Sequence, residues 1–244
     1  MKSAAERLHA ALEWNTDLLR QANSDDNPGE RQHLMQLQAW QRQRLHLTYA
    51  DLIEQDRFQD ACHFFLDELY GGEDFSQRHS ELARVEPIMS RLMPGHLLHT
   101  VAAALEVQAL SLDLDWTVAQ QLAAFQHADQ EELAIDQIRY AQAYRAAGRR
   151  DDRERQLEMI AEVGQALDSV VHKGWVQRLL RLLRGPATAA GFGELQEFLE
   201  SGFAAFKQMR GAEPFLQAIQ QREGAAMEAI FAGAERPFPT LDLA

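Results

Sequence analysis

The chain has one cysteine among its 244 residues, Cys62, so an intramolecular disulfide framework is excluded and a reducing compartment is indicated. Cys62 stands close to Phe64 and Phe65 in a helical pattern. This setting favours a buried, unreactive thiol over a nucleophile.

Residues that favour β-strands are also few, because Val, Ile and Thr are heavily outnumbered by Leu and Ala. Leu and Ala are among the best helix formers. We therefore predict an all-α protein, a multi-helix bundle of about nine or ten helices that ends in a C-terminal helical hairpin.

Positive charge is in deficit, since 24 Lys and Arg stand against 37 Asp and Glu, for a net charge of −13. A nucleic-acid binder needs a basic footprint against the phosphates, so we expect no nucleic-acid partner.

No apolar run approaches the roughly 18 residues of a membrane span. The first residues include Glu6 and Arg7 where a signal peptide would be apolar. We expect a soluble, cytoplasmic protein.

Known catalytic and phosphate-binding signatures are missing. The sequence has no Gly-x-Ser-x-Gly elbow, no glycine-rich phosphate loop ending in Lys-Ser or Lys-Thr, and no dinucleotide fingerprint. A non-enzymatic role is therefore favoured.

Nine histidines raise the question of a metal site. The patterns with ligand-like spacing are Glu30-x-x-His33, Asp60-x-x-His63 and the pair His96 and His99. The first two share the spacing used by di-iron bundles, but such a site needs further carboxylates from other helices. The histidine pair lacks a third ligand. We predict no metal and no cofactor, and we keep His63, His96 and His99 as candidate ligand-binding residues.

Breaks in the apolar periodicity divide the chain into expected helices. These cover residues 3–21, 30–55, 58–70, 74–92, 96–112, 116–125, 129–147, 151–183, 192–209 and 213–232. The expected interruptions are a bend at 113–115, a kink or split at Pro87, a break at Lys173-Gly174 and a stop at Gly185-Pro186. We predict a main bundle over 1–185, a hairpin over 186–232 packed on it, and an extended tail over 233–244.

Residues 64–78 hold the most informative pattern, an aromatic-rich helix end, the double glycine Gly71-Gly72 and a new helix start. Four polar residues there form a candidate functional cluster: Asp67, Tyr70, Asp74 and Arg78. They could bring together acids, a hydroxyl and a bidentate cation. The structural alternative makes the aromatics core, Asp74 a helix cap and Arg78 an ion-pair partner, and it explains every residue type except Tyr70.

The same stretch resembles a motif of a family of uncharacterised bacterial proteins, which reads Phe-Phe-Leu-x-Asp-Leu-Tyr-Gly, then Asp-Phe-Ser, then Arg. The likeness extends more loosely through residues 84–87 and 195–206. Family members often carry Asp after the Arg, where this chain has His79. The family has no assigned activity, so the resemblance implies relatives and no chemistry.

Residues 172–184 form a basic amphipathic pattern in an otherwise acidic chain. One side holds Trp175, Val176, Leu179, Leu182 and Leu183, and the other holds Lys173, Gln177, Arg178, Arg181 and Arg184. Such a helix can lie on an anionic surface. The alternative buries the leucines in the core and pairs the arginines with acids, and this is the outcome we expect.

The C-terminal helices carry a long aromatic stripe that includes Phe192, Phe198, Phe203 and Phe206, followed by Phe215 and Phe231. Exposing so much aromatic area in a monomer would be costly, so the stripe either completes the core or forms a subunit interface. We expect a homodimer and a non-enzymatic interaction protein, with a metal- or small-molecule-binding bundle, possibly an enzyme, as the alternative.

Overall fold

The computed structural model describes residues 3–22, 28–69, 76–125 and 133–242. In these ranges the chain forms eleven α-helices and no strand, which confirms the all-α prediction. The α-helices are α1 (Ala4–Ala22), α2 (Pro28–Thr48), α3 (Ala50–Ile53), α4 (Asp56–His63), α5 (Ser76–Leu92), α6 (Gly95–Ala124), α7 (Gln137–Ala147), α8 (Arg150–Val171), α9 (Gly174–Ala189), α10 (Gly193–Gln208) and α11 (Glu213–Phe231).

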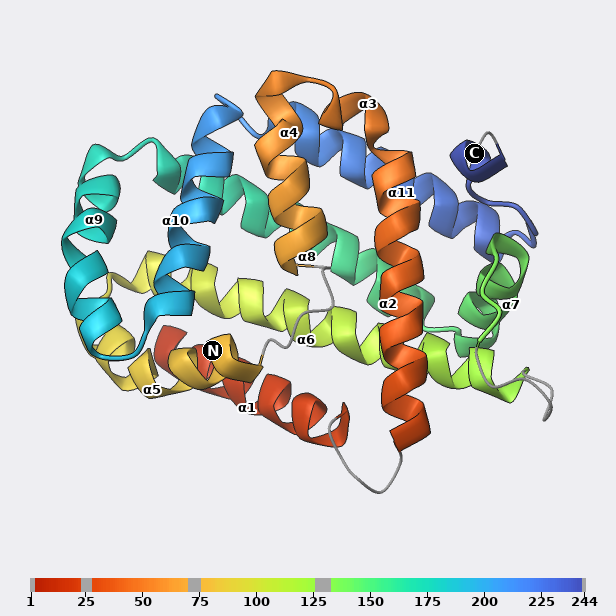
Figure 1. The fold of residues 1–244 in the computed structure, drawn as a ribbon, viewed down its shortest axis with the longest axis horizontal. Helices are drawn as coiled ribbons and strands as arrows, with labels where there is room; N and C mark the ends of the chain where they lie inside the picture. Colours follow the sequence, from red (N-terminus) through yellow and green to blue (C-terminus); the bar gives the residue numbers. More distant parts are fainter. Residues whose placement is uncertain (1–2, 23–27, 70–75, 126–132, 243–244) are drawn as a thin grey trace.

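The long helices are arranged in two directions (Figure 1). Helices α1, α6, α8 and α11 run roughly along the long axis of the molecule, and α2, α4, α9 and α10 cross them. Helix α6 is the central element, since it packs against α1, α2, α7 and α8. The whole bundle is therefore built around one 30-residue helix.

Helix α6 corrects two expectations. It runs without a break through residues 113–115, because Asp115 is buried and faces neighbouring helices instead of marking a bend. By length and composition it is also apolar enough to cross a membrane, so the expectation that no segment approaches this is wrong. The central helix of a globular bundle has the same length and composition.

Three helix boundaries also differ from those expected. Helix α7 begins at Gln137, where the Asp136 side chain accepts a hydrogen bond from the Arg139 amide and caps the helix. Helix α5 keeps Pro87 in its interior without splitting. Helix α9 continues through Pro186 to Ala189.

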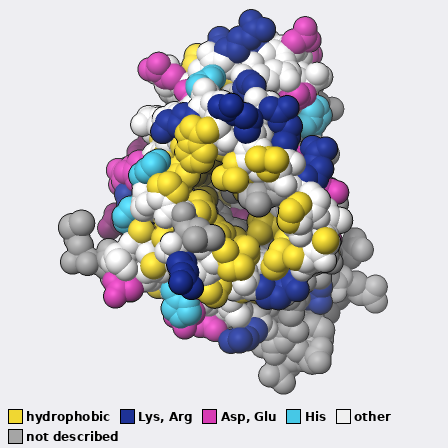
Figure 2. All heavy atoms as spheres, turned by 90° about the vertical axis from the view of Figure 1, so that its left-hand side faces the viewer, with side chains coloured by type: hydrophobic (Ala, Val, Ile, Leu, Met, Phe, Trp, Pro, Cys, Tyr) yellow, Lys and Arg dark blue, Asp and Glu magenta, His cyan; other side chains and the backbone are white. Residues whose placement is uncertain are grey.

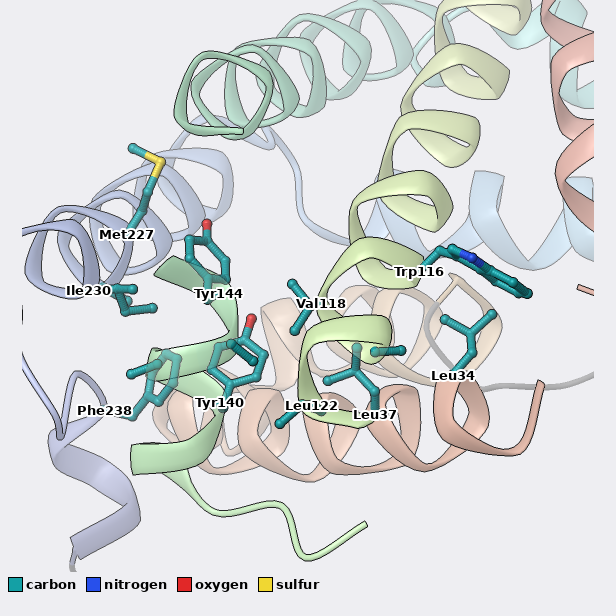
Figure 3. Packing of buried hydrophobic residues seen from close by; sticks show 14 residues of the cluster. Leu34, Leu37, Trp116, Val118, Leu122, Tyr140, Tyr144, Met227, Ile230 and Phe238 are labelled. Carbon is teal, nitrogen blue, oxygen red and sulfur yellow. The ribbon is translucent and has the colours of Figure 1, made fainter. Parts of the chain in front are cut away.

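One core cluster lies where α2, α6, α7 and α11 meet (Figure 3). The Tyr140 ring has its centroid 4.6 Å from that of Trp40 and 5.8 Å from that of Phe238. Phe238 belongs to the segment predicted as an extended tail, yet it is buried, and a short 3₁₀ helix follows at Pro239–Asp242. The end of the chain thus completes this core.

A second core cluster joins α4 to α8, α10 and α11. Residues Phe64–Leu69 continue α4 as a π-helix, and Phe64 and Phe65 pack inward as predicted. The Phe65 ring lies 5.8 Å from that of Phe206 and 5.3 Å from that of Phe215. The aromatic motif of residues 64–78 is therefore a packing element at its first two positions.

The aromatic stripe of the C-terminal helices is mostly internal. Phe206 and Phe215 are buried, and Phe203 packs against the same cluster. Gly202 lets α10 approach the π-helix, since a Cβ built there would lie 2.6 Å from Cζ of Phe64. The stripe on which the expected dimer interface rested therefore packs within the chain.

We expect Gly202→Ala to destabilise the fold by about 1–3 kcal/mol, because the new methyl overpacks a Phe64 ring that is held by Phe65 and Phe198. Gly224→Ala in α11 is the matched control. Nothing lies within 4 Å of its Cβ position, so it should stabilise the fold by up to about 1 kcal/mol. Urea unfolding followed by circular dichroism measures both, and equal stability of the two variants would contradict the Gly202–Phe64 contact.

Candidate docking surface

The four-residue candidate cluster is only partly within the described residues. Tyr70 and Asp74 lie outside them, and so do the side chains of Asp67 in the π-helix and Arg78 in α5. His79, at the position where the related family often has Asp, shares a 2.8 Å hydrogen bond with Thr16 of α1. Burial lowers the pKa of His79, so near neutral pH it links α5 to α1 in its neutral form.

The candidate ligand-binding histidines are spread over the surface. His63 is exposed at the end of α4, and His96 and His99 are exposed in the first turns of α6. Within the described ranges no three His, Cys, Asp or Glu side chains gather in a way that could hold a metal ion.

Cys62 is buried, as the sequence predicts. Burial raises the pKa of its thiol to about 11, and the charge of Asp51 adds to the shift. We expect iodoacetamide at pH 8 to label Cys62 at least about a hundredfold more slowly in the folded protein than in urea, because two pKa units remove that share of the thiolate. Equal rates would contradict a buried thiol.

A buried polar network, which we did not predict, lies between α2, α6, α7 and α8. The Gln41 amide nitrogen donates to Asp115 Oδ1 at 3.1 Å and reaches the Tyr140 hydroxyl at 3.4 Å. Arg153 Nη1 lies 3.8 Å from Asp115 Oδ1, and its guanidinium covers the Tyr144 ring at 4.6 Å. Burial raises the pKa of Asp115, although Arg153 and Gln41 favour its charged form.

The network continues to α11 through Arg44. Its Nη1 donates to both carboxylate oxygens of Glu223 at 2.7 Å, and the Tyr49 hydroxyl donates to Glu223 Oε1 at 3.1 Å. The two best-formed pockets lie elsewhere, one beside Phe125 and one on the outer face of α2 around Met35. The network is enclosed among packed helices, so its role is to align them.

We expect Arg44→Met to cost up to about 3–5 kcal/mol, because it leaves the half-buried Glu223 carboxylate without its cation. The double variant Arg44→Met/Glu223→Met should recover most of that loss, since no uncompensated charge remains. Arg20→Met is the matched control at the exposed Arg20–Asp17 pair, where a change within about 1 kcal/mol is expected. Urea unfolding measures all three, and an Arg44→Met loss as small as the control's would exclude a structural role.

Helix α9 is tied to α10 by hydrogen bonds, and its half-buried residues are Val176, Gln177, Leu180 and Ala187. Gln177 accepts from the Lys207 ammonium at 3.0 Å, and the Gln196 amide donates to the Leu180 carbonyl at 2.8 Å. Arg184 Nε donates to Glu200 Oε1 at 3.0 Å. All three contacts tie α9 to α10.

The apolar side of α9 is left open, which corrects our expectation that its leucines are in the core. Trp175, Leu179 and Leu182 are 42%, 44% and 74% exposed. At 100° per residue they fall within a narrow arc roughly opposite Arg184 and Gln177. An amphipathic helix normally buries such residues, whereas α9 half-buries Val176, Gln177 and Leu180 and leaves this arc exposed.

Two arginines border the apolar arc. Arg178 and Arg181 are exposed on one side of it, and Lys173 is exposed at the helix start. No carboxylate of the described residues lies within 4 Å of these three cations, whereas Arg184 pairs with Glu200. We call Trp175, Leu179, Leu182, Arg178 and Arg181 together the α9 face. The expectation that the basic residues all pair with acids of the same molecule holds only for Arg184.

Helix α5 holds the turn between α9 and α10 in place. The carboxylate of Glu81, buried in α5, accepts from the Leu195 amide at the start of α10 at 2.9 Å. Arg84 of α5 donates to the Gly191 carbonyl at 2.7 Å and covers the Phe192 ring at 4.8 Å. The turn between α9 and α10 is therefore fastened to α5.

The end of the molecule that α5 and α9 form is hollowed (Figure 2). Figure 2 shows hydrophobic side chains around the hollow and Lys and Arg side chains along its margin. Helix α9 packs on α10 and on the end of α8. Trp175, Leu179 and Leu182 therefore lie on the surface of this end of the molecule and not in a core.

The family model described as "Domain of unknown function (DUF8198)" matches residues 19–237, and the chain belongs to this family. No curated protein and no solved structure matches the chain.

Proposed function

We propose that this protein is a non-enzymatic interaction protein that binds a partner protein through the α9 face. The observation that carries the proposal is the exposed apolar arc of α9, flanked by two arginines that pair with no carboxylate of the described residues. The other exposed large hydrophobic residues are Trp14, Met35, Ile88, Phe125 and Leu199. Single exposed residues are normal on protein surfaces, whereas three in one arc of one helix indicate an interaction site.

The energetics support the proposal. Fully burying a side chain such as Leu or Phe is favourable by about 1.5–3 kcal/mol. Trp175, Leu179 and Leu182 are well exposed, so much of this burial free energy is still available to a partner. A partner that covers these three side chains would gain this free energy without rearranging the bundle, because α9 is already bound to α10. Large aromatic and arginine side chains are also the residues that dominate binding energy at interfaces.

A photoreactive benzophenone side chain at position 182 tests this in the cells that make the protein. We expect a specific cross-linked adduct from position 182 and none from the control position 35, which is exposed on the outer face of α2. A partner identified in this way counts as support only if it binds the wild-type protein once purified. That binding should be lost in Leu179→Ser/Leu182→Ser and kept in Met35→Ser. Adducts of equal yield from both positions, or binding that survives the double variant, would contradict the proposal.

A further inference from the structure

We infer that the partner of the α9 face is an acidic amphipathic helix that lies along α9, with its apolar side on Trp175, Leu179 and Leu182 and its carboxylates on Arg178 and Arg181. This inference rests on the proposed function and names the partner's chemistry. The exposed apolar residues follow the spacing i, i+4, i+7, so they form a stripe along the axis of α9. A stripe of this kind matches the apolar face of a second helix.

The charges beside the apolar stripe indicate that the partner segment is negatively charged. Arg178 and Arg181 are exposed, and no carboxylate of the described residues lies within 4 Å of either. The other cation near α10, Arg184, is already satisfied by Glu200. Two guanidinium groups that have no carboxylate partner among the described residues, beside an apolar stripe, favour a segment that carries Glu or Asp next to its own apolar residues.

A second copy of this chain fits the α9 face poorly. In a two-fold interface the same surface meets itself, so Arg178 and Arg181 would face their own copies. A head-to-tail contact would need a second, complementary surface on the same chain, and unless it closed into a ring it would leave an α9 face open at one end of a growing fibre. Like charges across a close interface cost several kcal/mol in general, so an acidic partner of different sequence is favoured.

An anionic membrane fits less well for two reasons. The end of the molecule that carries α9 is hollowed, whereas an interfacial helix needs its apolar side to reach a flat surface (Figure 2). The net charge of −13 also repels an anionic surface as a whole. A single helix can enter a hollow and approach only the basic margin.

The probe is a fluorescein-labelled peptide of about 20 residues, long enough to be helical, with one face of Leu and the other of Glu. Two matched peptides replace every Glu by Gln or by Lys. We expect fluorescence anisotropy to show binding of the Glu peptide to the wild-type protein at least about tenfold tighter than that of the Gln peptide, and no binding of the Lys peptide.

Variants locate the site. Arg178→Gln/Arg181→Gln should weaken the Glu peptide about tenfold while leaving the Gln peptide unchanged, because only the charged contact is removed. The double variant Leu179→Ser/Leu182→Ser should abolish binding of both the Glu peptide and the Gln peptide, because both need the apolar contact. Arg31→Gln/Met35→Ser on the outer face of α2 is the matched control and should bind like the wild type. Circular dichroism confirms that each variant keeps its helix content.

Four outcomes would overturn the inference. These are equal affinity for the Glu and Gln peptides, an unchanged affinity in the double arginine variant, binding to phosphatidylglycerol vesicles that is lost in that variant, or a twofold mass in light scattering that Leu182→Ser abolishes. If the partner cross-linked from position 182 binds the wild type and the Arg178→Gln/Arg181→Gln variant equally well, the proposed function stands and the acidic helix is wrong. If position 182 yields no partner, the proposed function itself fails.

Discussion

The arrangement of the helices depends on four charged side chains at one junction, of which Arg44, Asp115 and Arg153 are buried and Glu223 is half-buried. Arg44 and Glu223 join α2 to α11, and Asp115 and Arg153 join α6 to α8. Buried ion pairs rarely add stability over apolar residues of similar size, but they restrict the geometry in which neighbouring helices can pack. Gln41 and Arg44, one turn apart on α2, must reach Asp115 and Glu223 at the same time. Only one rotation of α2 about its axis satisfies both.

This network favours specificity over maximal stability. Within the described residues, Gln41 Oε1 and Arg44 Nε have no hydrogen-bond partner. An unsatisfied buried polar atom costs about 1–3 kcal/mol, so a core selected for stability alone would avoid such positions. The aromatic rings of Tyr144 and Phe238 cover the two guanidinium groups instead, at 4.6 Å each. The centre of the core is therefore polar, and aromatic rings cover its two guanidinium groups.

The sequence predicts the helices well and their contacts poorly. Apolar periodicity and the excess of Leu and Ala locate the helices, because these signals are local. The network escapes prediction, since the partners of Asp115 come from positions 41 and 153, far away along the chain. On α9 the period separates an apolar side from a polar side correctly, but it cannot say which side has partners. Gln196, Glu200 and Lys207 of α10 bind the Leu180 carbonyl, Arg184 and Gln177, and these contacts between distant positions fix how α9 lies on α10.

The contrast between the α9 face and the rest of the molecule gives a physical basis for selectivity. With 37 acidic residues, most of the surface repels an acidic segment, and this repulsion acts over about a Debye length. At the α9 face the two free arginines reverse the sign locally, and the open apolar arc adds a contact that a purely charged segment cannot make. An acidic helix without an apolar stripe is therefore repelled by the acidic surface and gains little at α9. An apolar helix without acids loses the arginine contacts. Only a segment that carries both features gains from both contacts, so the net acidity of the chain sharpens recognition at the α9 face instead of opposing it.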